Sequence, residues 1–303
     1  FSSTWRDVKV YKDHAFIVSE AYFHGMQVVD LTKLRELDGS EVVKLDADTH
    51  YGDFGNAHNI AINTETGYAY GVGTSTCDGG LHIMNIKEPK TPRFVTCVGR
   101  GIYEVPQKHG DAYTHDVQCV VYKGEDVRYL GHEICISSNE DTVNVVDVTD
   151  KSAPYQISVA TYEGVKYTHQ GWLTEDHKYF LLGDELDEQN YGVNTKTFIW
   201  DFSDLENIKH FAVYESHTKA IDHNMYVKGE YVYQANYTAG MRILKLDQVD
   251  KGLLTEVGFM DPMPENDKAE FEGVWSLYPY FESGSVIVSG INGTLYITRP
   301  NLR

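Results

Sequence analysis

The chain has 303 residues, of which 42% are hydrophobic and 13% aromatic, and this is enough to bury a sizeable core and to exclude a disordered or collagen-like chain. Its 26 Lys and Arg against 45 Asp and Glu give a net charge of −19, so its surface repels phosphate backbones and anionic lipid. We therefore expect no nucleic-acid partner. No apolar run is long enough to span a bilayer, so we also expect no membrane insertion of this chain.

A repeat of about 50 residues runs along the chain. In each copy one polar residue opens a predicted strand, at intervals of 52, 57, 54, 54 and 49 residues; these residues are Arg6, His58, His115, His169, His223 and Glu272. A second strand follows, for example at 178–182, then an apolar third strand such as 142–148, then a fourth such as 209–214. Four short antiparallel strands per repeat are typical of a β-propeller with kelch-like spacing.

The repeat accounts for the whole chain, and no long helical pattern interrupts it. We therefore expect an all-β fold, a single β-propeller domain over residues 1–303 with six visible blades of four-stranded antiparallel sheet. The sixth repeat has room for three strands only, at 274–277, 285–289 and 294–298. Because an open sheet edge is unfavourable, we expect the domain to lack an N-terminal blade or closing strand.

Longer motifs carry a resemblance to a known family. Residues 113–124 (YTHDVQCVVYKG), 168–176 (THQGWLTED) and 222–229 (DHNMYVKG) are specific, and the match extends from Trp5 to the end of the chain. They resemble the choice-of-anchor B family, whose members carry LVIVD-type repeats. The resemblance implies a secreted or cell-surface propeller with no particular reaction, and a further blade before Trp5 that would make seven in the full protein.

The residue that opens each repeat is expected at the mouth of the central channel, and four of these six residues are His58, His115, His169 and His223. Imidazoles that converge from rigid strand ends form a preorganised site for Zn, Cu, Fe, Mn or Ni. We therefore expect a transition-metal ion or a small ligand at this mouth. The polar residues that follow are expected to fix the ring tautomers; they are Asp7, Asn59, Asp116, Gln170 and Asn224. The alternative is that the histidines recur by blade duplication and line a water-filled channel.

Arg6 and Glu272 complete the set and allow an enzymatic interpretation. Glu272 would be the general base and Arg6 would hold an anionic group, in a metal-dependent lyase or hydrolase acting on acidic saccharides. A third hypothesis is a structural or interaction module of an extracellular assembly, with protein partners. It is favoured by the fold and by the lack of any complete catalytic signature. A serine hydrolase and a nucleotide-binding protein are not expected, because the chain has no G-x-S-x-G elbow and no Gly-rich phosphate loop.

Residues 184–188 (DELDE) place four carboxylates in five positions. Carboxylate oxygens suit Ca²⁺, so Asp184 and Asp187 are candidate calcium ligands, and the loop at 189–195 could add carbonyl oxygens. The alternative is a solvated acidic run, because the spacing differs from that of an EF-hand loop.

The four cysteines form no C-x-x-C pair. Cys119 and Cys135 flank a hairpin-like stretch, so we expect one disulfide between them and a second between Cys77 and Cys97; the alternative is four buried free thiols. Two disulfides would place the protein in an extracellular or cell-surface location. In a eukaryotic secretory route the sequons at Asn236 and Asn292 would be glycosylation acceptors.

Overall fold

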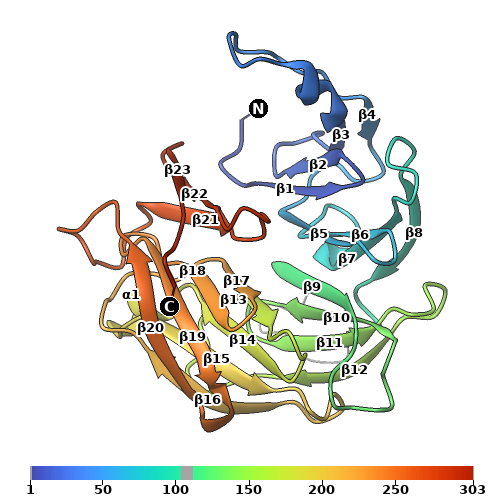
Figure 1. Ribbon diagram of the computed structural model, residues 1–303. Helices are drawn as coiled ribbons and strands as arrows, with labels where there is room; N and C mark the ends of the chain where they lie inside the picture. Colours follow the sequence, from blue (N-terminus) through green and yellow to red (C-terminus); the bar gives the residue numbers. More distant parts are fainter. Residues whose placement is uncertain (1, 104–111, 303) are drawn as a thin grey trace. The chain divides into compact units, whose positions relative to one another are not determined.

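The fold is built almost entirely from antiparallel β-strands (Figure 1). The computed structural model describes residues 2–103 and 112–302. Within them six sheets follow one another along the chain, and in each sheet every strand pairs with its neighbour in sequence. Five sheets have four strands and the sixth has three, as the repeat predicts. This is the topology of propeller blades, so the predicted class, a six-bladed β-propeller with few helices, is confirmed.

The strands have the following bounds. The first sheet contains β1 (Arg6–Tyr11), β2 (His14–Ser19), β3 (Met26–Asp30) and β4 (Thr49–Tyr51). The second contains β5 (Asn59–Asn63), β6 (Tyr68–Val72), β7 (Leu81–Asn85) and β8 (Arg93–Val98). The third contains β9 (Asp116–Val121), β10 (Glu133–Ser138), β11 (Val143–Asp147) and β12 (Tyr155–Ala160).

The fourth sheet contains β13 (Thr168–Leu173), β14 (Tyr179–Asp184), β15 (Lys196–Asp201) and β16 (Lys209–Glu215). The fifth contains β17 (Met225–Lys228), β18 (Tyr231–Ala235), β19 (Met241–Gln248) and β20 (Leu253–Met260), and the sixth contains β21 (Val274–Tyr278), β22 (Val286–Gly290) and β23 (Leu295–Thr298). The described helical segments are short; they are η1 (Leu31–Glu36), η2 (Cys77–Gly79), α1 (Asp187–Tyr191) and η3 (Val249–Lys251).

The chain divides into two compact units. The first comprises Phe1–Tyr122, Gly131–Asn139 and Asn144–Ile157, and the second comprises Lys123–Leu130, Glu140–Val143 and Ser158–Arg303. Within each unit the core lies between successive sheets. In the second unit, for example, Leu181 of β14 and Ile199 of β15 belong to one buried cluster with Val232 of β18 and Leu244 of β19. Inner strands covered on both faces are apolar at successive positions, which explains why the apolar third strand was recognisable in each repeat.

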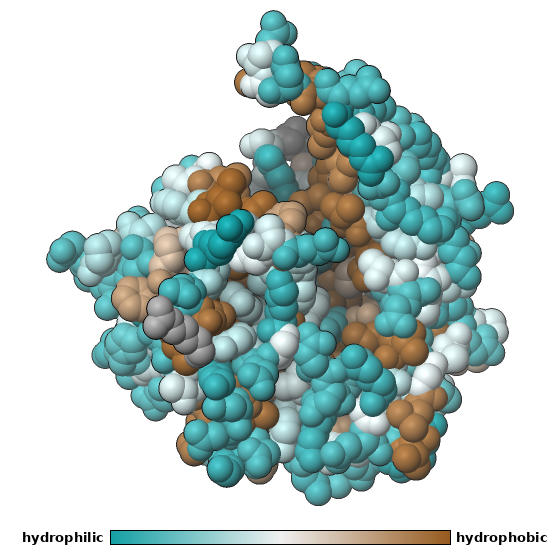
Figure 2. Space-filling view, in the orientation of Figure 1, coloured by the Kyte–Doolittle hydropathy of each residue, from teal (hydrophilic) through white to brown (hydrophobic). Residues whose placement is uncertain are grey.

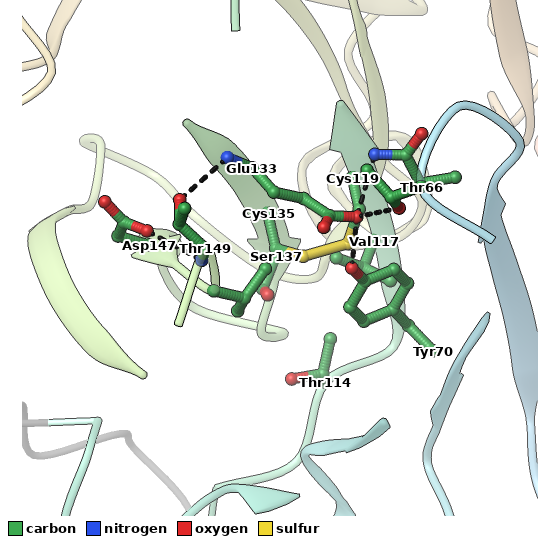
Figure 3. The surroundings of a disulfide bond; sticks show 12 residues. Thr66, Tyr70, Thr114, Val117, Cys119, Glu133, Cys135, Ser137, Asp147 and Thr149 are labelled. Carbon is green, nitrogen blue, oxygen red and sulfur yellow. Dashed lines mark hydrogen bonds between the residues drawn. A yellow bond between two sulfur atoms is a disulfide. The ribbon is translucent and has the colours of Figure 1, made fainter. Parts of the chain in front are cut away.

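Both predicted disulfides are present, Cys77–Cys97 and Cys119–Cys135. Cys119 of β9 and Cys135 of β10 are direct cross-strand partners. Beside the second disulfide, the buried carboxylate of Glu133 accepts hydrogen bonds from Thr66 Oγ1 at 2.7 Å and Tyr70 OH at 2.5 Å (Figure 3). All four cysteines are therefore oxidised, and the free-thiol alternative is excluded in this structure.

The visible face of the molecule is mostly polar (Figure 2). Hydrophilic residues cover most of the face shown in Figure 2, with smaller apolar areas between them. Across residues 2–103 and 112–302, no helix is both long enough and apolar enough to cross a membrane.

Candidate functional site

His169 lies in a β-bulge of β13. Thr168 pairs with Asp184 and Gly171 pairs with Leu182, so one more residue lies on β13 than on β14 between these two pairs. A bulge turns a side chain out of the regular alternation, and here it contains His169 and Gln170. Gly171 permits the close approach, because a Cβ at this position would lie 2.4 Å from the carbonyl oxygen of Leu181.

Gln170 ties this bulge to the next blade. Its side-chain Nε2 donates to the carbonyl oxygen of Met225 at 3.0 Å, and its Oε1 accepts from the Met225 backbone N–H at 2.8 Å. The side chain is buried, and these two bonds fix the start of β17 against β13. The expectation that Gln170 directly orients an imidazole is therefore corrected. Its side-chain amide binds the backbone of Met225, which lies two residues beyond His223.

His223 is oriented by a second bulge. Val274 pairs with Gly290 and Ser276 with Ser289, which leaves Trp275 as the extra residue of β21. Its carbonyl oxygen accepts a hydrogen bond from Nδ1 of His223. The neutral ring then carries its proton on Nδ1, so Nε2 offers a lone pair.

Glu185 lies between the two imidazoles. It follows β14 directly, and its carboxylate oxygens lie 3.6 Å from Nε2 of His169 and 3.7 Å from Nε2 of His223. The hydroxyl of Tyr237 donates to Glu185 Oε1 at 2.9 Å. Burial and the adjacent Glu185 carboxylate raise the pKa of Tyr237, so its hydroxyl keeps the proton that it donates.

These separations suit a small cation. The imidazole rings of His169 and His223 lie 4.5 Å apart between centroids, and one ligand atom from each histidine and from Glu185 lies within 4.8 Å of the others. Ligands around a tetrahedral ion with bonds of about 2.0–2.2 Å lie about 3.3–3.6 Å apart. The three side chains are 1%, 14% and 7% exposed, in the order His169, Glu185 and His223, so the group is shielded from water. Without an ion, the same imidazoles form ion pairs with Glu185 when they are protonated.

The first unit contains a related pair. His58 and His115 have ring centroids 4.1 Å apart, and Nδ1 of His58 donates to Glu20 Oε1 at 2.6 Å. Glu20 follows β2 directly, just as Glu185 follows β14. The structure thus brings the four predicted histidines together in pairs, each with a carboxylate, while a single ring of all four stays a prediction. Asn59 donates to Asp116 Oδ2 at 2.5 Å, so these two polar residues pair with each other.

The two candidate catalytic residues lie on the surface. Glu272 is exposed and precedes β21, and Arg6 opens β1, where its Nε donates to the carbonyl oxygen of Ser3 at 2.9 Å. The general-base role of Glu272 and the anion-clamp role of Arg6 stay untested predictions.

Asp184, a predicted calcium ligand, is occupied by hydrogen bonds. Its Oδ2 accepts from Tyr162 OH at 2.8 Å and from the Lys166 backbone at 2.7 Å, and its Oδ1 accepts from the Tyr167 backbone at 2.8 Å. It therefore anchors the segment that leads into β13.

Asp187, the other predicted calcium ligand, lies beside two carboxylates that the sequence did not single out, Glu188 and Asp222. All three are buried. Burial raises the pKa of each of these carboxyl groups, and the neighbouring carboxylates raise them further. Residues 184–188 are thus not a solvated acidic run.

Glu185, Glu188 and Asp222 are the residues that sequence reasoning missed as site members. Glu185 and Glu188 stand in the acidic run, and Asp222 directly precedes His223, so adjacency was the available signal. Adjacency in sequence could not show that Asp222 and His223 belong to two different donor groups.

Comparisons with known proteins support the fold. No family model matches the chain, and no curated protein matches it. A crystal structure of a protein from Lactobacillus plantarum superposes with a TM-score of 0.63 at 14% identity, over 99% of this chain and 84% of that one. The β-propeller domain of Cps50 (Swd1) from Myceliophteria thermophila superposes with a TM-score of 0.55 at 11% identity, over 95% and 81%. At these identities the likeness shows the β-propeller fold alone.

Proposed function

We propose that this chain is a secreted or cell-surface β-propeller that binds a divalent transition-metal ion through His169, Glu185 and His223. The observation that carries the proposal is the orientation of His223. Its Nδ1 donates to the Trp275 carbonyl, and its Nε2 faces Glu185. Metal-binding histidines characteristically donate their second ring N–H to a carbonyl or carboxylate, which fixes the tautomer.

The donor set fits such an ion. Two imidazole nitrogens and one carboxylate oxygen suit Zn²⁺ and also Fe²⁺, Mn²⁺, Co²⁺ or Ni²⁺, and they leave coordination positions for water or a small ligand. The Tyr237 hydroxyl holds the Glu185 carboxylate in place. A cation would also neutralise a carboxylate that is largely removed from water.

The location and family belong to the same proposal. The two disulfides are typical of oxidising compartments, and the acidic composition favours solubility there. The six apolar third strands and the THQGWLTED motif support membership of the choice-of-anchor B family.

Metal titration tests the proposal. Protein stripped with chelator and dialysed should take up one equivalent of Co²⁺, with ligand-field absorption from nitrogen and oxygen donors. His223→Ala and Glu185→Gln should weaken uptake at least about ten-fold. His217→Ala removes an exposed histidine of the same unit and should leave uptake unchanged. Equal uptake by all four proteins, or no uptake by the parent protein, would refute the site.

A further inference from the structure

A second donor group lies beside the proposed transition-metal site and contains only oxygen ligands. Asp187 and Glu188 come from α1, and Asp222 comes from the segment before β17. One carboxylate oxygen from each residue lies within 4.8 Å of the others. The residues are 2%, 1% and 2% exposed, respectively, so the group is almost completely buried.

Most of these oxygens have no hydrogen-bond donor. Within residues 2–103 and 112–302, no group outside these three residues donates a hydrogen bond to either carboxylate oxygen of Glu188 or Asp222, or to Oδ1 of Asp187, and the three carboxyl groups can bond to one another only when protonated. The ammonium group of Lys196 contacts the remaining oxygen, Asp187 Oδ2, at 3.0 Å. A buried carboxylate without a partner is strongly unfavourable, so these oxygens require protons or a cation.

We infer that Asp187, Glu188 and Asp222 bind a divalent cation of the Ca²⁺ class. Three ionised carboxylates and the Lys196 ammonium group have a net charge of −2, which one divalent cation neutralises. A donor set made only of carboxylate oxygens favours Ca²⁺, Mg²⁺ or Mn²⁺ over softer ions. Bonds of about 2.3–2.6 Å allow oxygens on one Ca²⁺ to lie up to about 5 Å apart, which matches the observed spacing.

The surroundings of this group fix where its carboxylates lie. Glu188 lines a pocket of about 380 Å³ together with Thr218, Asp267 and neighbouring residues, and its carboxylate oxygens are buried beneath this pocket surface. A Cβ at Gly183 would lie 1.8 Å from Asp222 Oδ2. Only glycine at position 183 leaves room for the Asp222 carboxylate where it is.

Calcium titration of the whole chain tests the inference. After dialysis against EGTA, isothermal titration with Ca²⁺ at pH 8 should show one site in the parent protein. Glu188→Gln keeps the shape and removes one charge, and it should weaken binding at least about ten-fold. Gly183→Ala should weaken binding without removing a charge. Asp267→Asn, an exposed carboxylate of the same pocket, is the matched control and should bind as the parent protein does.

The outcomes separate this inference from the proposed function. His223→Ala should lose Co²⁺ uptake and keep the Ca²⁺ site. If the parent protein binds no Ca²⁺, the three carboxylates hold protons only and the inference is wrong. It is also wrong if Glu188→Gln, shown by circular dichroism to be folded, binds Ca²⁺ with unchanged affinity. Should Glu188→Gln not fold, Ca²⁺ must still raise the unfolding midpoint of the parent protein and of Asp267→Asn, and failure to do so refutes the site.

Discussion

Removal of the Cys119–Cys135 disulfide should destabilise the first unit. The two cysteines are 16 positions apart in sequence. The chain-entropy relation for a closed loop of this length gives about 3 kcal/mol at 25 °C. The double variant Cys119→Ala/Cys135→Ala should therefore lose about 3 kcal/mol of unfolding free energy. Urea unfolding at equilibrium measures this loss, with the parent protein in the presence and absence of reductant for comparison.

The location of the effect is a sharper test than its size. All four cysteines lie in the first unit, so the loss of stability is expected in that unit. The second unit, which contains Trp172, Trp200 and Trp275, should be unaffected. Hydrogen exchange followed by mass spectrometry should show the loss of protection in peptides of the first unit. The reasoning is refuted if the double variant and the parent protein unfold at the same urea concentration. It is also refuted if protection is lost mainly in the second unit.

Three further changes test other parts of the account. Burial lowers the pKa of His82 from 6.5 to about 4. The unfolded chain then binds more protons than the folded chain between pH 6.5 and 4, so stability falls as the pH falls through this window, by at most about 3.4 kcal/mol. His82→Gln should reduce this acid-induced loss in urea unfolding at pH 7 and 4.5, and an unchanged loss would contradict the assignment. Glu133→Ala leaves the largely buried Lys151 ammonium group without its carboxylate partner, and Thr66 and Tyr70 without their acceptor, so it should cost about 3–5 kcal/mol. Glu125→Ala breaks a surface pair and should cost less than about 1 kcal/mol; equal losses in urea unfolding would contradict this. Tyr237→Phe removes the hydrogen bond to Glu185 and should weaken Co²⁺ binding about ten-fold without loss of fold, and unchanged affinity would show that this bond does not position the ligand.

The strand pattern was predictable from sequence because each blade repeats the same pattern of apolar and polar residues. Inner strands are apolar on both faces, and the residue that opens each blade is polar. The cysteine pairing followed from the same pattern, since Cys119 and Cys135 stand at matching positions of two predicted neighbouring strands.

The site was predictable only in part. The histidines were found because they share one position in the repeat, but their orientation depends on bulges at His169–Gln170 and at Trp275. A bulge depends on pairing with a partner strand, which one segment of sequence does not reveal. The same difficulty applies within the acidic run at 184–188. The backbone N–H groups of residues 166 and 167 donate hydrogen bonds to Asp184, whereas the carboxylate of Glu188 in α1 lies close to that of Asp222.

The central claim is that one metal ion is held by His169, Glu185 and His223. Crystals of protein purified without chelator test it most directly, with diffraction recorded on both sides of the absorption edge of the metal found by elemental analysis. The account predicts an anomalous peak about 2.0–2.2 Å from Nε2 of both histidines and from an oxygen of Glu185. Ordered side chains with no anomalous peak between them, even after the crystals are soaked in Zn²⁺, would contradict it.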